Sequence, residues 1–277
     1  MVSMQCTNRR EFLKTAGVAG LGLVALSGVA GSIISCATPN SLATGQPSSG
    51  QGEPAALPWP YKKLDPKAAA ERAYAAYYNG GCMYGAFEGI IGELRDSVGA
   101  PYDTVPTAFS KYGGAGVSGW GTLCGALNGM AAATYFFLDS KSAGPIINDV
   151  YGWYGSTSLP DYKPVTPKFD TLPGSVANSQ LCHASVTNWC NASGFKTTSP
   201  ERAERCAWIT ASVVYKTVEL ANQQADGAFK QTFADPASVT GCLSCHGKGS
   251  TLENVHTSNA TDCRVCHTTF PSAHPVQ

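Results

Sequence analysis

The chain has 277 residues, of which 43% are hydrophobic and 14% are charged, and its formal net charge is zero. This balance excludes a disordered chain, because there is enough apolar surface to form a core, and it gives no basis for nucleic-acid binding. Eleven cysteines are too many for an ordinary cytosolic enzyme, and they call for haem, a metal or disulfides.

Residues 1–36 have the pattern of an export signal. A twin-arginine motif lies in residues 7–14, TNRREFLK, and a Gly/Ala-rich apolar run follows in residues 16–35. A retained membrane anchor is the alternative, but the run is marginal in length and rich in glycine. Residues 33–36, IISC, resemble a lipoprotein cleavage box that would leave Cys36 lipidated; simple cleavage nearby is equally compatible. We expect a periplasmic or otherwise extracytoplasmic protein, tethered to a membrane if Cys36 carries lipid.

Residues 37–64 are rich in Ser, Gly, Pro and Gln and predict a flexible tether. A helical, cysteine-rich domain is predicted over residues 65–230, followed by a loop-rich segment over 231–277. The expected helices cover residues 67–78, 82–98, 122–138, 143–153 and 200–225, the first capped by Asp65 and the last by Ser199. Residues 158–173 are predicted to form a loop, and residues 174–194 an irregular segment. Convincing strand patterns are absent, so the predicted fold class is mainly α.

A glycine-rich loop spans residues 113–121, GGAGVSGWG, and contains a literal G-x-G-x-x-G match. A dinucleotide site would need a strand before this loop, and residues 109–112, FSKY, are too short and polar to supply one. We therefore interpret the loop as a flexible entry to the next helix, with a backbone that can approach a cofactor closely.

Two C-x-x-C-H pentads stand near the end of the chain, at Cys242, Cys245 and His246 and at Cys263, Cys266 and His267. This pattern marks covalent c-type haem attachment, because two thiols at this spacing can add to the vinyl groups on one side of a porphyrin. The histidine that follows is then held over the iron as its proximal ligand. Four thiolates of a zinc ribbon are the competing interpretation, but a zinc ribbon does not need a histidine after each second cysteine. We predict two haems c close together.

Histidine is expected to supply the sixth haem ligands as well. After the signal the only methionines are Met83 and Met130, at positions typical of helix interiors, which argues against Met/His ligation. His256 and His274 lie on the predicted haem-bearing segment, residues 231–277, and are the predicted sixth ligands of bis-histidine irons. Alternatively, one of them or His183 reaches the haem of a second subunit, His183 serves a metal beside its neighbouring cysteines, or any one of these histidines is simply exposed.

Five cysteines remain once Cys6, Cys36 and the four pentad cysteines are subtracted from the eleven: Cys82, Cys124, Cys182, Cys190 and Cys206. Two disulfides and one free thiol are one interpretation. The other is four thiolates on an iron–sulfur cluster or another metal, with one thiol spare. Three of the five stand on predicted helices, which can converge on one buried point. Twin-arginine export also carries folded proteins, so a centre inserted before export would explain the signal. We favour the metal centre.

Residues 121–129, GTLCGALNG, resemble the core of the C-GCAxxG-C-C redox family, with Cys82 upstream and Cys190 and Cys206 downstream. With the two pentads that follow, residues 65–277 are similar to the split-Soret cytochromes c. This resemblance implies an exported, dimeric, dihaem electron-transfer protein with an additional cysteine-bound iron centre. It carries over to Cys124, Cys82 and Cys206, and it leaves the choice between Cys182 and Cys190 open.

The 36 residues from the first pentad cysteine onward contain few large apolar side chains and cannot enclose two haems. The haems must pack on the helical domain, on each other or on another subunit, and a homodimer with haems near its interface would satisfy this. Nothing resembles an acid–base pair or a nucleophilic triad, so we predict an electron carrier that serves redox partner proteins. The alternative is a periplasmic reductase that uses an open haem or cluster on a small oxidised substrate.

Overall fold

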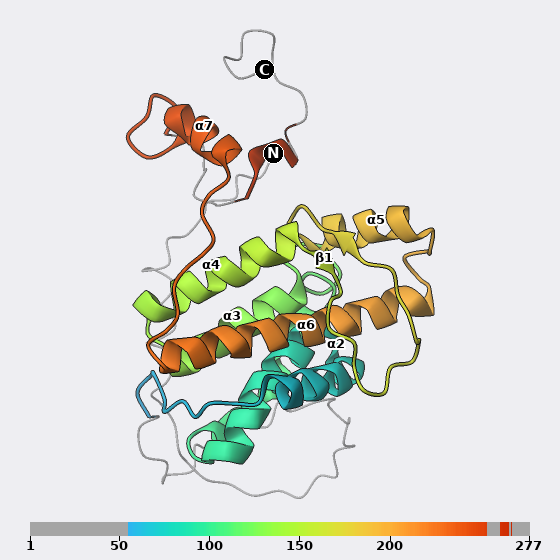
Figure 1. The fold of residues 1–277 in the computed structure, drawn as a ribbon, viewed down its shortest axis with the longest axis vertical. Helices are drawn as coiled ribbons and strands as arrows, with labels where there is room; N and C mark the ends of the chain where they lie inside the picture. The colour runs from blue at the N-terminus through green and yellow to red at the C-terminus, as the bar shows by residue number, and fades with distance from the viewer. Residues whose placement is uncertain (1–54, 254–260, 266, 268–277) are drawn as a thin grey trace, which may run out of the picture. The chain divides into compact units, whose positions relative to one another are not determined.

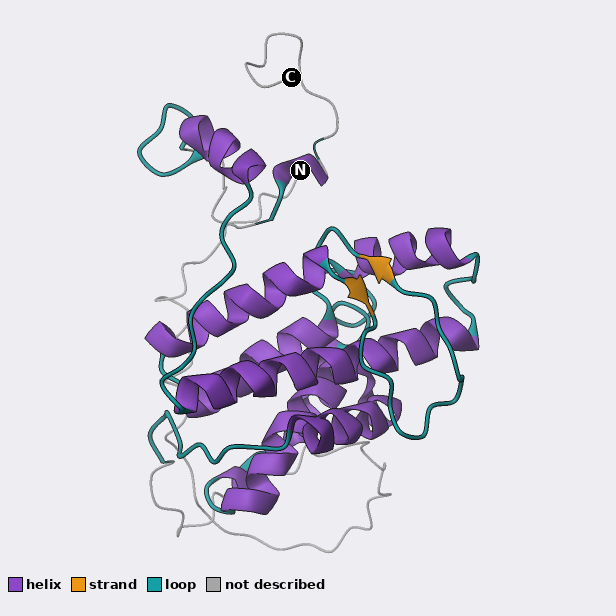
Figure 2. Ribbon diagram, viewed as in Figure 1, coloured by secondary structure: helices purple, strands orange, loops and turns teal. Residues whose placement is uncertain are grey.

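The computed structural model describes residues 55–253, 261–265 and 267, and it is mainly helical, as predicted (Figure 2). The helices are α2 (Pro66–Val98), α3 (Gly125–Phe137), α4 (Ser140–Ser156), α5 (Cys182–Ser193), α6 (Pro200–Ala225) and α7 (Ala237–His246). Short 3₁₀ turns cover Tyr102–Thr104, Thr107–Gly113 and Cys263–Val265, and the strands β1 (Ser158–Leu159) and β2 (Ser175–Val176) form one antiparallel pair. In this described part, no helix is long and apolar enough to cross a membrane.

Helix α2 begins where the sequence predicts, and it joins two helices that were predicted as separate. The Asp65 carboxylate accepts a hydrogen bond from the Lys67 amide at 2.9 Å, and Pro66 takes the first helical position. At Gly81 the backbone leaves the helix, with φ 81° and ψ −176°, and helical geometry resumes directly after it. Glycine tolerates this conformation because it has no Cβ. The two predicted helices therefore meet at a kink, and Cys82 stands at the start of the second one.

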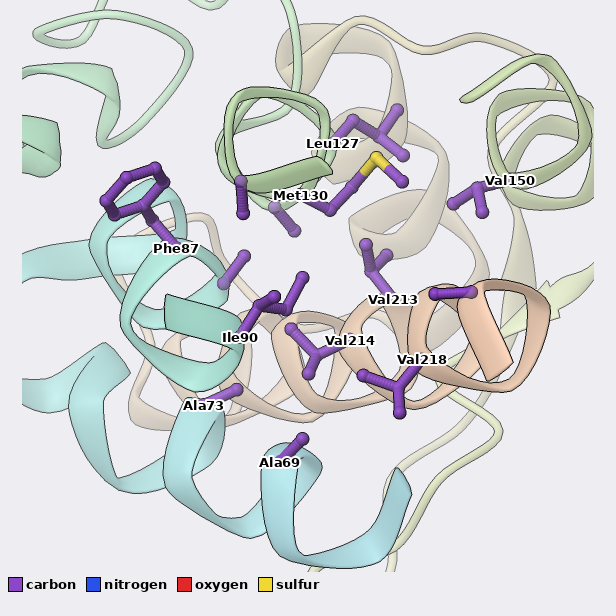
Figure 3. Close-up of a cluster of buried hydrophobic side chains, with 14 of the residues drawn as sticks. Ala69, Ala73, Phe87, Ile90, Leu127, Met130, Val150, Val213, Val214 and Val218 are labelled. Carbon is purple, nitrogen blue, oxygen red and sulfur yellow. The ribbon is translucent and has the colours of Figure 1, made fainter. Parts of the chain in front are cut away.

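Helix α6 is the long element against which the others pack. Ser199 caps it by accepting a hydrogen bond from the Arg202 amide at 3.2 Å, and the helix contacts α2, α3 and α4 (Figure 1). Figure 3 shows side chains from these four helices pointing toward one another, including Ile90, Met130 and Val214. Both methionines are buried, with Met83 1% and Met130 0% exposed, which confirms that they lie in helix interiors.

The entry to α3 differs from the prediction. The helix begins at Gly125 rather than at Thr122, because Leu123 forms an isolated antiparallel bridge with Leu181. Cys124 consequently occupies the N-cap position, with non-helical φ −54° and ψ 128°, instead of lying within the helix. Helix α4 begins three residues earlier than expected, since the Asp139 carboxylate caps it by accepting from the Ser142 amide at 2.9 Å.

The prediction of an irregular segment over residues 174–194 is wrong in its second half. Residues 182–193 form α5, and Gly194 ends it in the left-handed conformation at φ 77°. The sequence pattern did not predict this helix because it has no apolar stripe. Its buried residues are Ser185 and Trp189. The short β1–β2 pair was not expected either, and it closes the loop that contains residues 160–174.

The connection from α6 to α7 is fastened to the helical domain by Asp149, a buried residue of α4. Its carboxylate accepts hydrogen bonds from the Thr232 amide at 3.0 Å and hydroxyl at 3.1 Å, and from the Phe233 amide at 2.7 Å. The Phe233 ring lies so close to Gly152 that a Cβ there would come within 2.0 Å of it. Helix α7 itself was not predicted, and Val239 is its only buried residue.

Candidate redox site

Four of the five cysteines that lie outside both the signal and the pentads line one small cavity in the helical domain. The cavity holds about 20 Å³, close to the space of one water molecule. Its other walls include Tyr154 of α4, Ser185 of α5 and Arg205 of α6. The cysteines that line it are Cys82, Cys124, Cys182 and Cys206.

Each of the four thiols comes from a different element. Cys82 follows the kink of α2, Cys206 lies in the second turn of α6, and the other two are placed by the Leu123–Leu181 bridge. Beside this bridge the Cys124 amide donates to the Gln180 carbonyl at 2.9 Å, and the Cys182 amide donates to the Thr122 carbonyl at 2.6 Å. The bridge thus sets the N-cap of α3 against the first residue of α5, with both thiols on the cavity.

The four thiols lie close together as unoxidised side chains, with Cys82 and Cys124 buried and Cys182 and Cys206 partly exposed. Burial raises the pKa of Cys82 to about 12, and the nearby Cys124 and Cys206 thiols act in the same direction. Burial likewise raises the pKa of Cys182 to about 12, again assisted by Cys124 and Cys206. No disulfide joins the cysteines of the described part of the chain. Without a metal, the Cys82 and Cys182 thiols therefore stay protonated near neutral pH.

Two glycines of α3 allow the close packing around the cavity. A Cβ on Gly125 would come within 2.4 Å of the Cys82 sulfur and 2.7 Å of the Gly113 carbonyl. A Cβ on Gly129 would come within 2.4 Å of the Met83 carbonyl. These contacts explain the second and third glycines of the GTLCGALNG motif: they let α3 approach the second half of α2, which carries Cys82.

Cys190 and His183, two other predicted candidates, do not line this cavity. Cys190 is half-buried on α5, eight residues after Cys182. The His183 side chain is exposed, although its amide donates to the Gly121 carbonyl at 3.0 Å. Of Cys182 and Cys190, between which the sequence left the choice open, Cys182 is the one that lies beside the other three thiols.

Sequence analysis missed the polar part of the cavity wall. Arg205 is 2% exposed, and its Nη2 donates to the Ser185 hydroxyl at 2.8 Å. The Tyr154 hydroxyl donates to the same Ser185 oxygen at 2.8 Å. One signal was available: Arg205 falls on the buried side of α6, four residues before Ile209 and eight before Val213.

The described part of the haem-bearing segment brings the two pentads together. Cys242 and Cys245 share α7 at a spacing of three residues, and His246 ends that helix. Burial and the neighbouring Cys242 thiol raise the pKa of Cys263, so these thiols from different pentads are adjacent. His267 is exposed. The other predicted haem residues, Cys266, His256 and His274, lie outside the described residues.

A second, open cavity of about 790 Å³ lies beside the second pentad. This is within the range of small-molecule and cofactor sites. One wall comes from the helical domain and includes Gly152, Asn178, Gln180 and Asn188, and the other includes Phe233, Pro236, Thr261, Asp262, Arg264 and Val265.

Comparison with known proteins decides the family. Residues 84–220 match the C-GCAxxG-C-C family of redox-active proteins. A relative named split-Soret cytochrome c, from Desulfovibrio desulfuricans, is 38% identical over 263 residues, which cover 90% of this chain and 92% of the relative. The chain belongs to the split-Soret cytochrome c family. The resemblance predicted from the motifs is thereby confirmed, and the chain is a redox protein.

A solved structure of the split-Soret cytochrome c from D. desulfuricans, described as having a novel iron centre, matches this fold as well. The TM-score is 0.71 at 40% identity, and the match covers 76% of this chain and 90% of that one. About three quarters of this chain therefore has a counterpart of known structure.

The donor set around the small cavity suits iron, although the thiols are not arranged as the ligands of a single ion. All four donors are cysteine sulfurs, the type that iron–sulfur centres use. Nevertheless, no three His, Cys, Asp or Glu side chains within the described residues form a set that could hold a metal ion as they stand. The donor chemistry fits an iron centre, and the thiols would have to rotate toward it or be bridged by more than one iron.

Gln180 links this cavity to the second pentad. Its carbonyl accepts from the Cys124 amide at 2.9 Å, its Nε2 donates to the Tyr151 carbonyl at 3.0 Å, and its Oε1 accepts from the Thr261 hydroxyl at 3.2 Å. Thr261 precedes Cys263 by two residues. A few covalent and hydrogen bonds therefore connect a thiol of the cavity with a thiol of the haem-bearing segment.

Proposed function

We propose that this split-Soret cytochrome family member is an exported electron carrier with two covalently bound haems c and a separate cysteine-bound iron centre. The observation that carries the proposal is the pairing of two thiol sites in one chain. One is the cavity lined by four cysteines, and the other is the pair of adjacent pentads. Haem and thiolate-bound iron both exchange single electrons, and that is the chemistry these sites would supply.

The pentads would hold the haems. Cys242 and Cys245 would form the thioether bonds to one porphyrin, and Cys263 and Cys266 those to the other. The histidine after each pair, His246 or His267, would be the proximal ligand. The large cavity beside Cys263 is of a size for a cofactor, and Phe233 and Val265 supply apolar contacts while Arg264 and Asn188 supply polar ones.

Histidines are the proposed sixth ligands. His256 and His274 follow on the same segment. Because Met83 and Met130 are buried in the helical core, these two histidines are the natural sixth ligands of the haem irons. Two histidine ligands would leave no open position on either iron. This favours electron transfer over reduction of a small substrate, which would need a vacant position.

The iron centre would be held by Cys82, Cys124, Cys182 and Cys206. Their side chains line one small cavity, and a metal would keep them as thiolates. An iron–sulfur cluster suits this set better than a single ion, because sulfide bridges would span the space between sulfurs that do not converge on one point.

The location and assembly are part of the same proposal. The twin-arginine motif and the cleavage box at Cys36 support export to the periplasm, with a lipid tether as an option. Among the described residues of the haem-bearing segment only Val239 is buried, so this segment offers little apolar cover for porphyrin. A homodimer that shields the haems at its interface would supply the cover.

Spectroscopy and metal analysis of the purified protein test the proposal. A pyridine haemochrome assay should give two haems c per chain, and total iron should exceed the haem iron, with acid-labile sulfide present. The reduced protein should not bind carbon monoxide. The absence of haem would overturn the assignment of the pentads as haem sites. Total iron equal to the haem iron would overturn the separate iron centre, and carbon monoxide binding would favour a reductase.

A further inference from the structure

The buried guanidinium of Arg205 lacks a counter-ion. Arg205 is 2% exposed, and no Asp or Glu in the described part of the chain forms an ion pair with it. Its Nη2 donates to the Ser185 hydroxyl at 2.8 Å and to the Ser185 carbonyl at 3.3 Å, while its Nε has no hydrogen-bond partner. A buried cation left in this state is costly, so a negative charge is expected beside it.

Neighbouring charged residues do not supply that negative charge. Glu204 is adjacent in sequence, but its carboxylate accepts from Trp208 Nε1 at 2.7 Å and from the Tyr74 hydroxyl at 2.8 Å. Arg202, one turn earlier, is a cation too; its Nε donates to the Thr197 carbonyl at 2.6 Å, and its side chain is partly exposed. Arg205 is thus the buried cation on this side of α6.

The guanidinium instead faces sulfur. It lines the same cavity as the four cysteines, and its Nη1 lies 4.0 Å from the Cys206 sulfur. The Ser185 hydroxyl, which also accepts from the Tyr154 hydroxyl, accepts from the guanidinium, and the Trp189 ring lies 6.0 Å from the Arg205 Cζ. A neutral thiol carries no charge, whereas a metal-bound cysteine is a thiolate. Thiolate ligands would therefore provide the counter-charge that the residues themselves lack.

We propose that Arg205 is a positioning residue whose fixed charge balances the thiolates of the iron centre and raises its reduction potential. The inference rests on the proposed function, since it needs the iron centre to exist. Reduction makes the iron centre more negative by one unit of charge. A cation beside its thiolate ligands therefore stabilises the reduced form more than the oxidised form. The same cation should make the iron-free protein less stable than a neutral residue would.

The test removes the charge in the haem- and iron-loaded protein. In Arg205→Met and Arg205→Gln, the ratio of reduced to oxidised iron centre at a fixed potential should fall at least tenfold, equivalent to about 59 mV for one electron. An EPR-monitored titration with dithionite measures this. Arg205→Lys should restore most of the shift because it keeps the charge. Lys216→Gln, on the same helix, removes a partly exposed cation and should leave the ratio unchanged.

Thermal unfolding separates this role from a merely structural one. After chelation of the non-haem iron, Arg205→Met should unfold at a higher temperature than the iron-depleted wild type, whereas the loaded variant should lose iron faster to the chelator. Equal destabilisation with and without iron, or an unchanged ratio in the loaded variants, would overturn the inference. A wild-type protein without non-haem iron would instead overturn the iron centre itself, so the two failures are distinguishable.

Discussion

The helical domain and the haem-bearing segment hold their thiols by opposite means. In the helical domain, four cysteines are placed by packed helices, with core residues such as Ile90 and Met130 fully buried around them. In the haem-bearing segment, the described residues bury only Val239, and the thiols stand on one short helix and a 3₁₀ turn. The first site is built by side-chain packing, and we expect the second to acquire its packing from the porphyrins.

The largest effect should follow from removal of one haem site. In the double variant Cys242→Ala and Cys245→Ala, the haemochrome absorbance per chain should fall to half, because the second pentad is intact. Since the segment has almost no core of its own, protease cleavage after residue 236 should accelerate, while the helical domain should keep its far-UV circular dichroism. Retention of both haems, or collapse of the helical domain, would contradict the contrast between the two regions.

Much of this contrast could be predicted from the sequence. The pentads are local motifs whose chemistry depends on five consecutive residues, so they predict haem attachment without any knowledge of the fold. The caps at Asp65 and Ser199 are also local and were predicted, whereas two separate helices were expected where the structure has one helix kinked at Gly81. The four-thiol cavity is different, because its members are 124 residues apart from Cys82 to Cys206 and meet only through helix packing.

The second prediction tests which thiols belong to the four-cysteine site of the helical domain. Cys182→Ser should remove most of the non-haem iron, since the hydroxyl is a poor substitute for a thiolate at a sulfur-bound iron. Cys190→Ser is the matched control on the same helix and should retain the iron, because Cys190 does not line the cavity. Iron and sulfide analysis of both variants measures this. The reverse pattern would transfer the site to Cys190.

Sequence reasoning could not choose between these two cysteines for a physical reason. The choice depends on α5, and this helix is held by Trp189, Ser185 and one bridge between Leu123 and Leu181 instead of an apolar stripe. A single pair of β-bridge residues in an α protein has no sequence pattern. The buried Arg205 was missed similarly, since its meaning appears only when Ser185 and the thiols are seen around it.

A third prediction concerns the close approach of α2 and α3 beside the four-cysteine site. In Gly125→Ala the new Cβ would lie 2.4 Å from the Cys82 sulfur, so the variant should lose non-haem iron and unfold at a lower temperature. Gly144→Ala is the control: it lies in α4 with nothing within 4 Å of the added Cβ. There alanine should raise the free energy of unfolding by about 0.5–1 kcal/mol and leave the iron in place. Equal iron contents would show that the site tolerates a wider spacing.

The smallest expected effect lies at the junction of the two regions. Asp149→Ala removes the acceptor for the Thr232 amide and hydroxyl and the Phe233 amide. Loss of these buried bonds should lower the free energy of unfolding by about 1–3 kcal/mol. Asp149→Asn keeps one oxygen acceptor and should lose less.

The Asp149→Ala variant also tests how the haem-bearing segment is attached to the helical domain. Because Asp149 belongs to the helical domain and its partners to the connection, Asp149→Ala should expose residues 231–236 to protease while both kinds of iron stay bound. Limited proteolysis with mass spectrometry of the fragments measures this. If the connection resists cleavage as well as it does in the wild type, then the haem-bearing segment is held to the helical domain by the haems themselves, and the hydrogen bonds of Asp149 are secondary.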